Sequence, residues 1–230
     1  MNTALALLPY YSDPVYQHSH SVFAAQLPHA TIQGVASIDQ ARNILLASAL
    51  KHETADVFVF IDGDIEFSLN DWNMIVEAAR ETKGIVGAVY STKQLGGKMV
   101  GEPKDFDQSV SFYDKGKLYE ANALGMGFTS MHRSAIEKMC EAYPAIEMTA
   151  RPGRLASPLF MSLVHEGRCW GEDFAFSIRA RACGVPMFLD TRQKLKHWGR
   201  LGFRIEELGI SSPEVSSVTV ATLKKEGAKP

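Results

Sequence analysis

A run of apolar residues that ends in two carboxylates constrains the fold of this chain more than any other stretch. Residues Val57 to Ile61 are β-branched or aromatic without a break, which is typical of a strand buried on both faces of a sheet. Asp62, Gly63 and Asp64 follow directly. In an open α/β sheet, ligands collect beyond the carboxyl ends of the strands. Carboxylate oxygens there suit Mg²⁺, Ca²⁺ or Mn²⁺, although a solvated turn fits this stretch alone equally well.

The composition fits a soluble globular protein of one domain. The chain has 230 residues, of which 46% are hydrophobic and 22% are charged, and its formal net charge is −2. This charge gives no overall attraction to nucleic acid or to anionic membranes. Three widely spaced cysteines, without a zinc-ligand pattern, indicate reduced thiols (Cys140, Cys169, Cys183). No apolar run approaches the ~20 residues of a spanning helix, so we expect no membrane span and a cytoplasmic protein.

Extended and helical patterns alternate along residues 1–90. We expect strands at 4–8, 31–35, 57–61 and 84–90, and helices at 18–27, 38–52 and 68–82. Ser37 and the pair Ser68 and Asp71 are the expected helix caps. Such alternation predicts an α/β fold, with a mostly parallel central sheet flanked by helices on both faces.

The second half of the chain has a different character. We expect a small hairpin at 110–120, a strand at 123–132, helices at 134–143 and 172–183, and a short strand at 187–190. Residues 149–168 are rich in proline and glycine, which predicts a long mobile connection of the kind that often serves as a lid or binding loop. Residues 201–230 are expected to form a C-terminal tail.

Two further clusters carry side chains suited to chemistry. Glu172 and Asp173 follow Trp170 and Gly171 where a helix begins, and because a helix N-terminus favours negative charge, they fit a capping role as well as a catalytic one. His197 follows the next strand, where a structural histidine is the commoner case. Five basic residues without an acid fit either a solvated face or an anion-binding one (Arg192, Lys194, Lys196, Arg200, Arg204).

Taken in chain order, these motifs resemble the GT-A glycosyltransferases, which use nucleotide sugars. The resemblance rests on a strand ending in Asp62-x-Asp64, then Trp170-Gly171-Glu172-Asp173 at a helix start, then His197. Ala41-Arg42-Asn43 and Gly125-Met126-Gly127-Phe128 also resemble segments of short viral and bacterial members. The likeness implies a Rossmann-like GT-A fold and one catalytic domain at 1–200, with a nucleotide-sugar half at 1–100 and an acceptor half at 101–200. It also implies the cytoplasm of a bacterium or of a virus-infected host cell.

The resemblance assigns donor-binding roles residue by residue. Asp64, Asp62 and His197 are implied ligands of Mn²⁺ or Mg²⁺, which holds the diphosphate of the donor and neutralises the charge of the departing nucleotide. The implied nucleotide-sugar contacts are Pro9, Tyr10, Tyr11, Arg42, Asp62, Gly63 and Asp64. A UDP-sugar is the expected donor from family habit. Arg42 as a helix-surface cation stays open as the alternative.

The resemblance also assigns the transfer step. In inverting relatives, the second acid of the Glu-Asp pair takes the proton from the acceptor hydroxyl, which implies Asp173 as the general base and Glu172 as a hydrogen-bond partner of sugar. Helix N–H donors are expected to keep Asp173 ionised. A retaining enzyme stays open. Implied contacts to the acceptor or donor sugar are Gly125, Gly127, Trp170, Gly171 and Glu172, although close packing explains the glycines and core filling the tryptophan equally simply.

Other readings compete with a glycosyltransferase of the hexosyltransferase class. A strand ending in Asp-Gly-Asp also resembles haloacid-dehalogenase-type phosphatases, in which Asp62 becomes the nucleophile and Asp64 the acid, but Glu66 stands where that family has Thr or Val. A non-catalytic module that binds a divalent cation or sugar through Asp62, Asp64 and Glu66 is a third hypothesis. The basic segment leaves room for an anionic acceptor such as modified nucleic acid.

Overall fold

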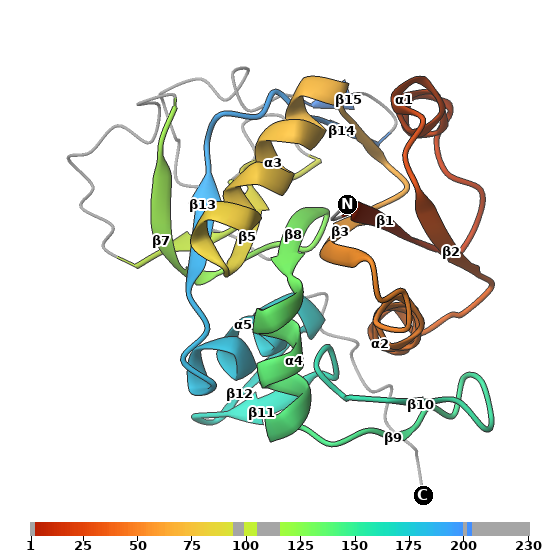
Figure 1. The fold of residues 1–230 in the computed structure, drawn as a ribbon, viewed down its shortest axis with the longest axis vertical. Helices are drawn as coiled ribbons and strands as arrows, with labels where there is room; N and C mark the ends of the chain where they lie inside the picture. The colour runs from red at the N-terminus through yellow and green to blue at the C-terminus, as the bar shows by residue number, and fades with distance from the viewer. Residues whose placement is uncertain (1–2, 94–98, 105–115, 200–201, 204–230) are drawn as a thin grey trace, which may run out of the picture.

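The computed structural model is organised by a central eight-stranded sheet with helices on both faces (Figure 1). It describes residues 3–93, 99–104, 116–199 and 202–203. The spatial order of the strands is β2 (His29–Gln33), β1 (Thr3–Tyr10), β3 (Ala55–Ile61), β8 (Phe128–His132), β5 (Ile85–Ala88), β13 (Met187–Asp190), β7 (Leu118–Ala123) and β6 (Glu102–Pro103). The predicted α/β class is confirmed.

The sheet is mixed, because six of its eight strands run in one direction and two, β8 and β7, run in the opposite direction. β1 is parallel to β2 and to β3, and β5 is parallel to β13. β8 lies between β3 and β5 and is antiparallel to both. β7 is antiparallel to β13 and to β6. The single strand expected at 123–132 is in fact the end of β7 and the whole of β8, because the intervening residues 124–127 turn the chain between two positions in the sheet.

Alternate residues of β3 face two helical layers. Phe58 and Phe60 pack into a core with α2, α4 and α5, whereas Val57, Val59 and Ile61 pack with α3. Each of these side chains is fully buried, as the continuous apolar run predicts for a strand covered on both faces. The described helices are α1 (Tyr16–Ala25), α2 (Ile38–Ala49), α3 (Leu69–Thr82), α4 (Arg133–Ala142) and α5 (Glu172–Ala182).

The helix starts follow the sequence signals in part. At α3, Ser68 and Asp71 form the predicted capping box. Ser37 occupies the position before α2, but its hydroxyl bonds to Asp39 and caps no backbone N–H. α4 begins one residue earlier than predicted, because the ring of His132 accepts a hydrogen bond from the backbone N–H of Ser134.

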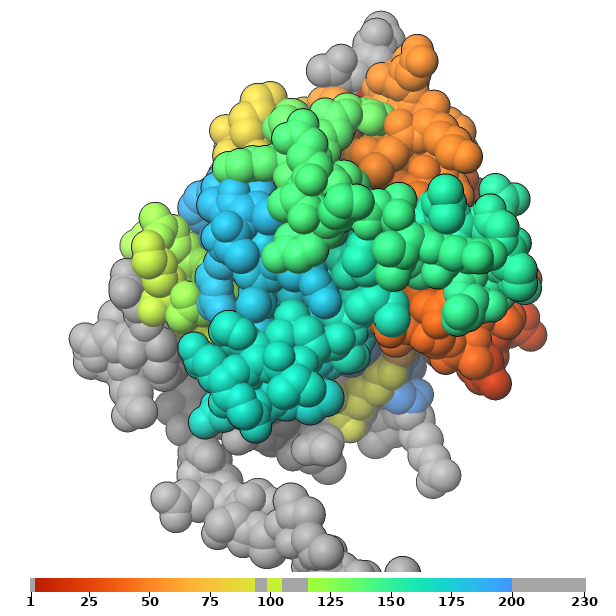
Figure 2. All heavy atoms as spheres, turned by 90° about the horizontal axis from the view of Figure 1, so that it is seen from below, coloured from red at the N-terminus to blue at the C-terminus, as the bar shows by residue number. Residues whose placement is uncertain are grey.

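The connection at 149–168 was predicted as a long loop, and most of it has no regular structure, but it also contains short strands that the prediction missed. It takes part in two short antiparallel pairs, β9 (Ile146–Glu147) with β10 (Leu155–Ala156), and β11 (Leu163–His165) with β12 (Arg168–Trp170). Gly153 and Gly167 have φ values of 78° and 72°, which glycine adopts without strain, so they close the turns between paired strands. With α4, this segment forms much of the face seen in Figure 2.

A smaller three-stranded sheet contains His197 and holds it next to the turn after β3. β14 (Lys196–Trp198) pairs antiparallel with β4 (Ile65–Glu66) and with β15 (Gly202–Phe203). Most of the predicted hairpin at 110–120 and nearly all of the predicted tail at 201–230 lie outside the described residues. Within the described ranges, no helix is both long and apolar enough to cross a membrane.

Candidate active site

The carboxyl ends of β1 and β3 open into a pocket of about 460 Å³. This is the edge of the sheet where the sequence predicts a ligand. The pocket brings together most of the predicted donor-binding residues, Pro9, Tyr10, Tyr11, Arg42, Asp62, Gly63 and Asp64, with Glu172 from α5. Lys93 and Trp198, which were not assigned to donor binding, also line it.

The turn after β3 is held by backbone hydrogen bonds on both sides. Ile65 N donates to Asp62 O over 3.1 Å, and Asp62 N donates to Gly127 O over 2.9 Å. Val15 N donates to Gly63 O over 2.8 Å. A Cβ atom at Gly63 would lie 3.1 Å from the ring of Tyr10, so glycine allows this aromatic ring to approach the turn closely. The direction of both aspartates is therefore fixed by their surroundings.

Arg42 links the two acidic motifs. Its Nη2 lies 2.7 Å from Asp62 Oδ1, and its Nη1 lies 2.8 Å from Glu172 Oε1. The Arg42 side chain is 3% exposed, because α2 places it beneath the pocket floor against the ring of Phe60. A planar guanidinium can bind two carboxylates at once. Arg42 thus positions both acids, and the alternative of a helix-surface cation is excluded by its burial.

Asp64 and His197 meet through the pairing of β4 with β14. His197 Nε2 lies 3.5 Å from Asp64 Oδ1, and His197 Nδ1 lies 2.8 Å from Ser91 O. A carbonyl oxygen only accepts, so Nδ1 carries a hydrogen, and Nε2 faces Asp64 with a lone pair in the neutral ring or with an N–H in the protonated ring. Asp64 Oδ1 is buried and has no hydrogen-bond partner among the described residues.

The charge around Asp64 favours its ionised form. Burial raises the pKa of this carboxyl, but the His197 ring with a proton on Nε2 and the Lys93 ammonium together outweigh burial and lower the pKa to about 2. The Lys93 ammonium is in contact with the other oxygen, Oδ2. Asp64 is therefore an anion throughout the physiological pH range, as a ligand of a divalent cation must be.

The donor atoms fit a cation that a bound ligand helps to hold. The unpartnered Asp64 Oδ1 and the imidazole Nε2 lie 3.5 Å apart, close enough for one cation to contact both atoms. The hydrogen bond from His197 Nδ1 to a carbonyl is the usual outer-shell support of a histidine that binds a metal. Among the described residues, no group of three His, Cys, Asp or Glu side chains is placed to hold a metal. Diphosphate or water oxygens would have to complete such a site.

Glu172 and Asp173 occupy the first turn of α5, with Gly171 at the N-cap position. Glu172 reaches the pocket, whereas Asp173 does not line it. Asp173 Oδ1 accepts a hydrogen bond of 2.8 Å from the N–H of Phe174. Burial, and then the charge of Glu172, nevertheless raise the pKa of Asp173. The backbone N–H groups of Phe174 and Asp173 lower this pKa without offsetting burial, and the expectation that helix N–H donors keep Asp173 ionised stays a prediction.

Gly125 and Gly127 pack behind the pocket against Tyr90. Gly127 N donates a 2.9 Å hydrogen bond to the Tyr90 hydroxyl, and a Cβ at Gly127 would lie 2.6 Å from that oxygen. The Tyr90 ring meets the His197 ring edge to face at 5.2 Å. Close packing thus explains these glycines, and neither lines the pocket.

Trp170 also lies away from the pocket. Its indole stacks on Phe174 with ring centroids 5.7 Å apart, and its Nε1 donates to His165 O over 3.3 Å. These contacts are within the region of β11, β12 and α5. A sugar contact by Trp170 or Gly171 stays a prediction.

Sequence reasoning missed a buried histidine that supports the site. His18 on α1 is fully buried, its Nε2 lies 2.6 Å from the Tyr10 hydroxyl, and its Nδ1 lies 3.1 Å from Ile65 O. This chain of hydrogen bonds ties Tyr10 to the residue that follows Asp64. Tyr90, Lys93 and His18 belong to no spacing pattern, so only the fold reveals them.

Comparison with known proteins reveals relatives at the level of fold. No protein-family model matches the sequence, and no curated protein matches it. The crystal structure of A197 from STIV is 19% identical, with a TM-score of 0.59 over 86% of each chain. The structure of GalNAc-T7 with UDP, GalNAc and Mn²⁺ is 12% identical, with a TM-score of 0.55 over 87% of this chain and 44% of that one.

The fold is of the GT-A type. The expectation from the Asp62-x-Asp64, Glu172-Asp173 and His197 motifs is confirmed for the fold class. At these identities the likeness carries the fold alone, and this chain spans less than half the length of the GalNAc-T7 chain. The chemistry must therefore be argued from the pocket itself.

Proposed function

We propose that the protein is a metal-dependent glycosyltransferase of the hexosyltransferase class, which moves a sugar from a UDP-sugar to an acceptor hydroxyl. The observation that carries the proposal is the meeting of three distant motifs at one pocket on a GT-A-type fold. Asp64 faces His197, and Arg42 joins Asp62 to Glu172. A fold neighbour holds UDP, GalNAc and Mn²⁺, which supports the choice of donor and cation.

The nucleotide part of the donor is assigned to the wall formed by the end of β1. Tyr11 is 71% exposed and Tyr10 stands beside Gly63, so both offer ring faces to a nucleobase. Lys93 also lines the pocket, and its ammonium, which pairs with the single carboxylate of Asp64, is the proposed contact of the donor's phosphate groups. The donor half at residues 1–100 and the acceptor half at 101–200 stay part of the proposal, although Glu172 and His197 from the later half also lie at the donor site.

Asp64 and His197 are the proposed metal-holding residues, with Asp62 kept in place by Arg42. A bound Mn²⁺ or Mg²⁺ would neutralise the negative charge that develops on the departing nucleoside diphosphate, an effect worth several kcal/mol. The surroundings of His197 fix its ring for this role. The Ser91 carbonyl accepts a hydrogen bond from Nδ1, and the paired strands β4 and β14 hold the imidazole beside Asp64.

Asp173 is the proposed general base, with inversion at the anomeric carbon. Its raised pKa makes it a stronger base than an ordinary carboxylate, so it accepts the proton of the acceptor hydroxyl more readily. Glu172, which Arg42 holds at the pocket, is the proposed partner of a sugar hydroxyl. In a retaining enzyme the same acids would bind sugar without removing a proton.

Two observations weigh against the rival functions. A haloacid-dehalogenase-type phosphatase needs Asp62 as a nucleophile, but Asp62 Oδ1 is bonded to Arg42, which lowers its reactivity. A calcium-dependent binding module needs several protein oxygens, but Glu66 is bonded to Trp198 Nε1 at 2.6 Å. Because Asp62 and Glu66 are engaged in these contacts, Asp64 and His197 are the pair proposed to bind a cation together with a diphosphate.

Isothermal titration of UDP, with and without MnCl₂, tests the proposal. We expect Mn²⁺ to strengthen UDP binding to the wild type and to do so far less in Asp64→Asn. Incubation with UDP-hexoses in the presence of Mn²⁺ should then release UDP when an acceptor is supplied. Calcium binding without nucleotide binding, or release of phosphate from generic esters that needs Asp62, would replace the proposal with one of its rivals.

A further inference from the structure

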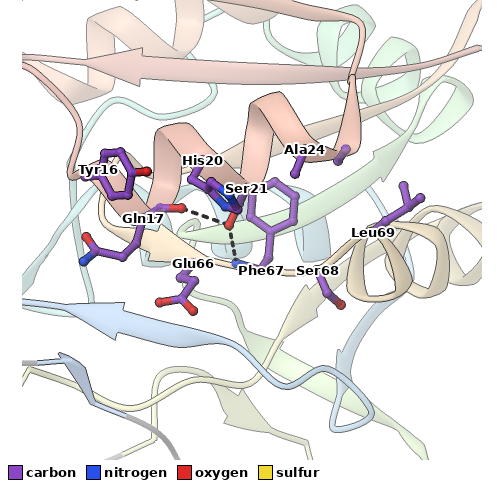
Figure 3. Close-up of a pocket in the computed structure, with 10 residues that line it drawn as sticks. Tyr16, Gln17, His20, Ser21, Ala24, Glu66, Phe67, Ser68 and Leu69 are labelled. Carbon is purple, nitrogen blue, oxygen red and sulfur yellow. Dashed lines mark hydrogen bonds between the residues drawn. The ribbon is translucent and has the colours of Figure 1, made fainter.

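A second pocket, of about 470 Å³, lies between α1 and the segment that joins β4 to α3 (Figure 3). Tyr16, His20 and Ala24 recur at every fourth position and so line up along one side of α1. Glu66 and Leu69 line the pocket opposite α1. A pocket of this size is in the range of small-molecule sites.

The base of this pocket is rigid. Ser21 and Phe67 are each 6% exposed, and Phe67 N donates to Ser21 Oγ over 3.2 Å. Ser21 Oγ in turn donates to Gln17 O over 3.0 Å, within α1. The bond from Phe67 N is therefore the one that joins the helix to the facing segment (Figure 3). The two walls are therefore held at a fixed separation before any ligand binds.

Flat rings stand exposed at one end of the pocket. The Tyr16 side chain is 76% exposed, and its ring lies 6.1 Å from the ring of His20 at a tilt of 37°. Neither ring is needed to fill the core, because both lie on the solvent side of α1. An exposed tyrosine offers an apolar face and a hydroxyl together, which suits a ligand with both kinds of surface.

The polar groups of the pocket suit a neutral ligand that is rich in hydroxyl groups. Its lining contains the carboxylate of Glu66 and the amide of Gln17, and it contains neither lysine nor arginine among the described residues. Glu66 Oε2 is held by Trp198 Nε1 at 2.6 Å, so the carboxylate is fixed at the pocket edge. A sugar hydroxyl donates readily to such a carboxylate.

We propose that this pocket binds a neutral carbohydrate, with the apolar face of a sugar ring on Tyr16 and its hydroxyls bonded to Glu66 and Gln17. The inference goes beyond the donor pocket and does not depend on a nucleotide or a metal. Trp198 touches both places, since its Nε1 binds Glu66 and the residue also lines the donor pocket. A carbohydrate held here is thus anchored beside the donor pocket without occupying it.

Saturation-transfer difference NMR with maltotriose and with chitotriose, in the absence of metal and nucleotide, tests the proposal. We expect signal transfer to at least one trisaccharide, and a fall in affinity of about tenfold in Tyr16→Ala. Phe23→Ala is the matched control, because Phe23 is 83% exposed on the same helix but lies outside the pocket lining. This control should bind as the wild type does.

Each result bears on the proposal. Loss of the signal in Tyr16→Ala and its retention in Phe23→Ala supports a carbohydrate site. Absence of binding to both trisaccharides, or equal loss in both variants, overturns it in favour of a general apolar surface for a protein partner. Tyr11→Ala separates the two pockets: it should weaken UDP binding and leave trisaccharide binding intact, so failure at one pocket is distinguishable from failure at the other.

Discussion

His197 Nε2 and Asp64 Oδ1 face each other across 3.5 Å, although one comes from β14 and the other from the turn after β3. The Nδ1 atom of His197 is bonded to Ser91 O, so the two facing atoms are both electron-rich when the ring is neutral. Such atoms repel unless a positive charge, either a ring proton or a cation, lies close to both. This pair is the main observation behind the proposed cation site.

Loss of His197 should therefore weaken metal-dependent nucleotide binding. In His197→Ala we expect the gain in UDP affinity on adding Mn²⁺ to fall by about 10-fold to 100-fold, because one of two protein ligands is lost. Titration calorimetry with and without the metal measures this. His165→Ala removes an exposed imidazole outside the pocket and should change nothing. An equal metal effect in both variants would remove His197 from the site.

Loss of the carboxylate at Asp173 should separate binding from transfer. In Asp173→Asn we expect UDP binding close to that of the wild type and a rate of transfer lower by about 100-fold to 10,000-fold, as for loss of a general base. A coupled assay of UDP release and calorimetry on the same preparation measure the two quantities. Transfer at the wild-type rate would exclude Asp173 as the base.

The same substitution should stabilise the fold near neutral pH. The pKa of Asp173 is raised above its ordinary value of 3.8 by burial and by Glu172, so the folded state holds this proton more tightly than the unfolded state does. The resulting stability is present at low pH and is lost as the pH rises through the folded-state pKa. We expect Asp173→Asn to melt at a higher temperature than the wild type at pH 7, with a smaller difference near pH 4. Glu166→Gln, in an exposed turn, is the control.

Removal of the Tyr10 hydroxyl should destabilise the protein through His18. In Tyr10→Phe the buried Nε2 of His18 loses its 2.6 Å partner, which costs about 1–3 kcal/mol. Tyr11→Phe removes a hydroxyl that is exposed, so its free energy of unfolding should match that of the wild type. Urea unfolding of the two variants measures the difference. Equal stabilities would show that the hydrogen bond to His18 contributes nothing.

Loss of Arg42 should cost more stability than loss of a more exposed arginine. Arg42→Met leaves Asp62 and Glu172 without the cation that joins them, and we expect the free energy of unfolding to fall by about 2 kcal/mol or more. Arg80 bonds Asp56 and Glu77 but is 28% exposed, so Arg80→Met should cost about 1 kcal/mol or less. Denaturant unfolding distinguishes the two. A smaller loss at Arg42 would mean that the bridge is not a structural element.

The sequence predicts where strands and helices lie along the chain better than it predicts which strands pair with each other. Val57–Ile61 reveals a doubly buried strand because burial on both faces demands continuous apolar residues, and Ser68 with Asp71 reveals the start of α3 because their side chains cap it. The antiparallel insertion of β8 could not be predicted, since a strand has the same burial pattern in either direction. The short pairs at 146–170 were missed because isolated pairs of two or three residues leave little periodicity.

The candidate site divides in the same way. The acids and His197 carry a residue type, a strand or helix end and an order along the chain, so the sequence points to them. His18, Tyr90 and Lys93 act through contacts that cross the fold, such as the bond from His18 to Ile65 O. A partner defined only by tertiary contact leaves no local pattern. The burial of Arg42 beneath Asp62 and Glu172 is of the same kind.

The position of β5 in the sheet limits how much of the chain can fold before synthesis is nearly complete. This strand comes from the first hundred residues, yet both of its neighbours, β8 and β13, are contributed by later parts of the chain. A fragment that stops before β8 would leave the apolar strand Ile85–Ala88 without either of its neighbours. Its unpaired N–H and C=O groups could then pair with another chain. The acidic turn after β3 likewise gains its final walls only when α5 and β14 have been synthesised, so the pocket is complete only when nearly 200 residues are in place.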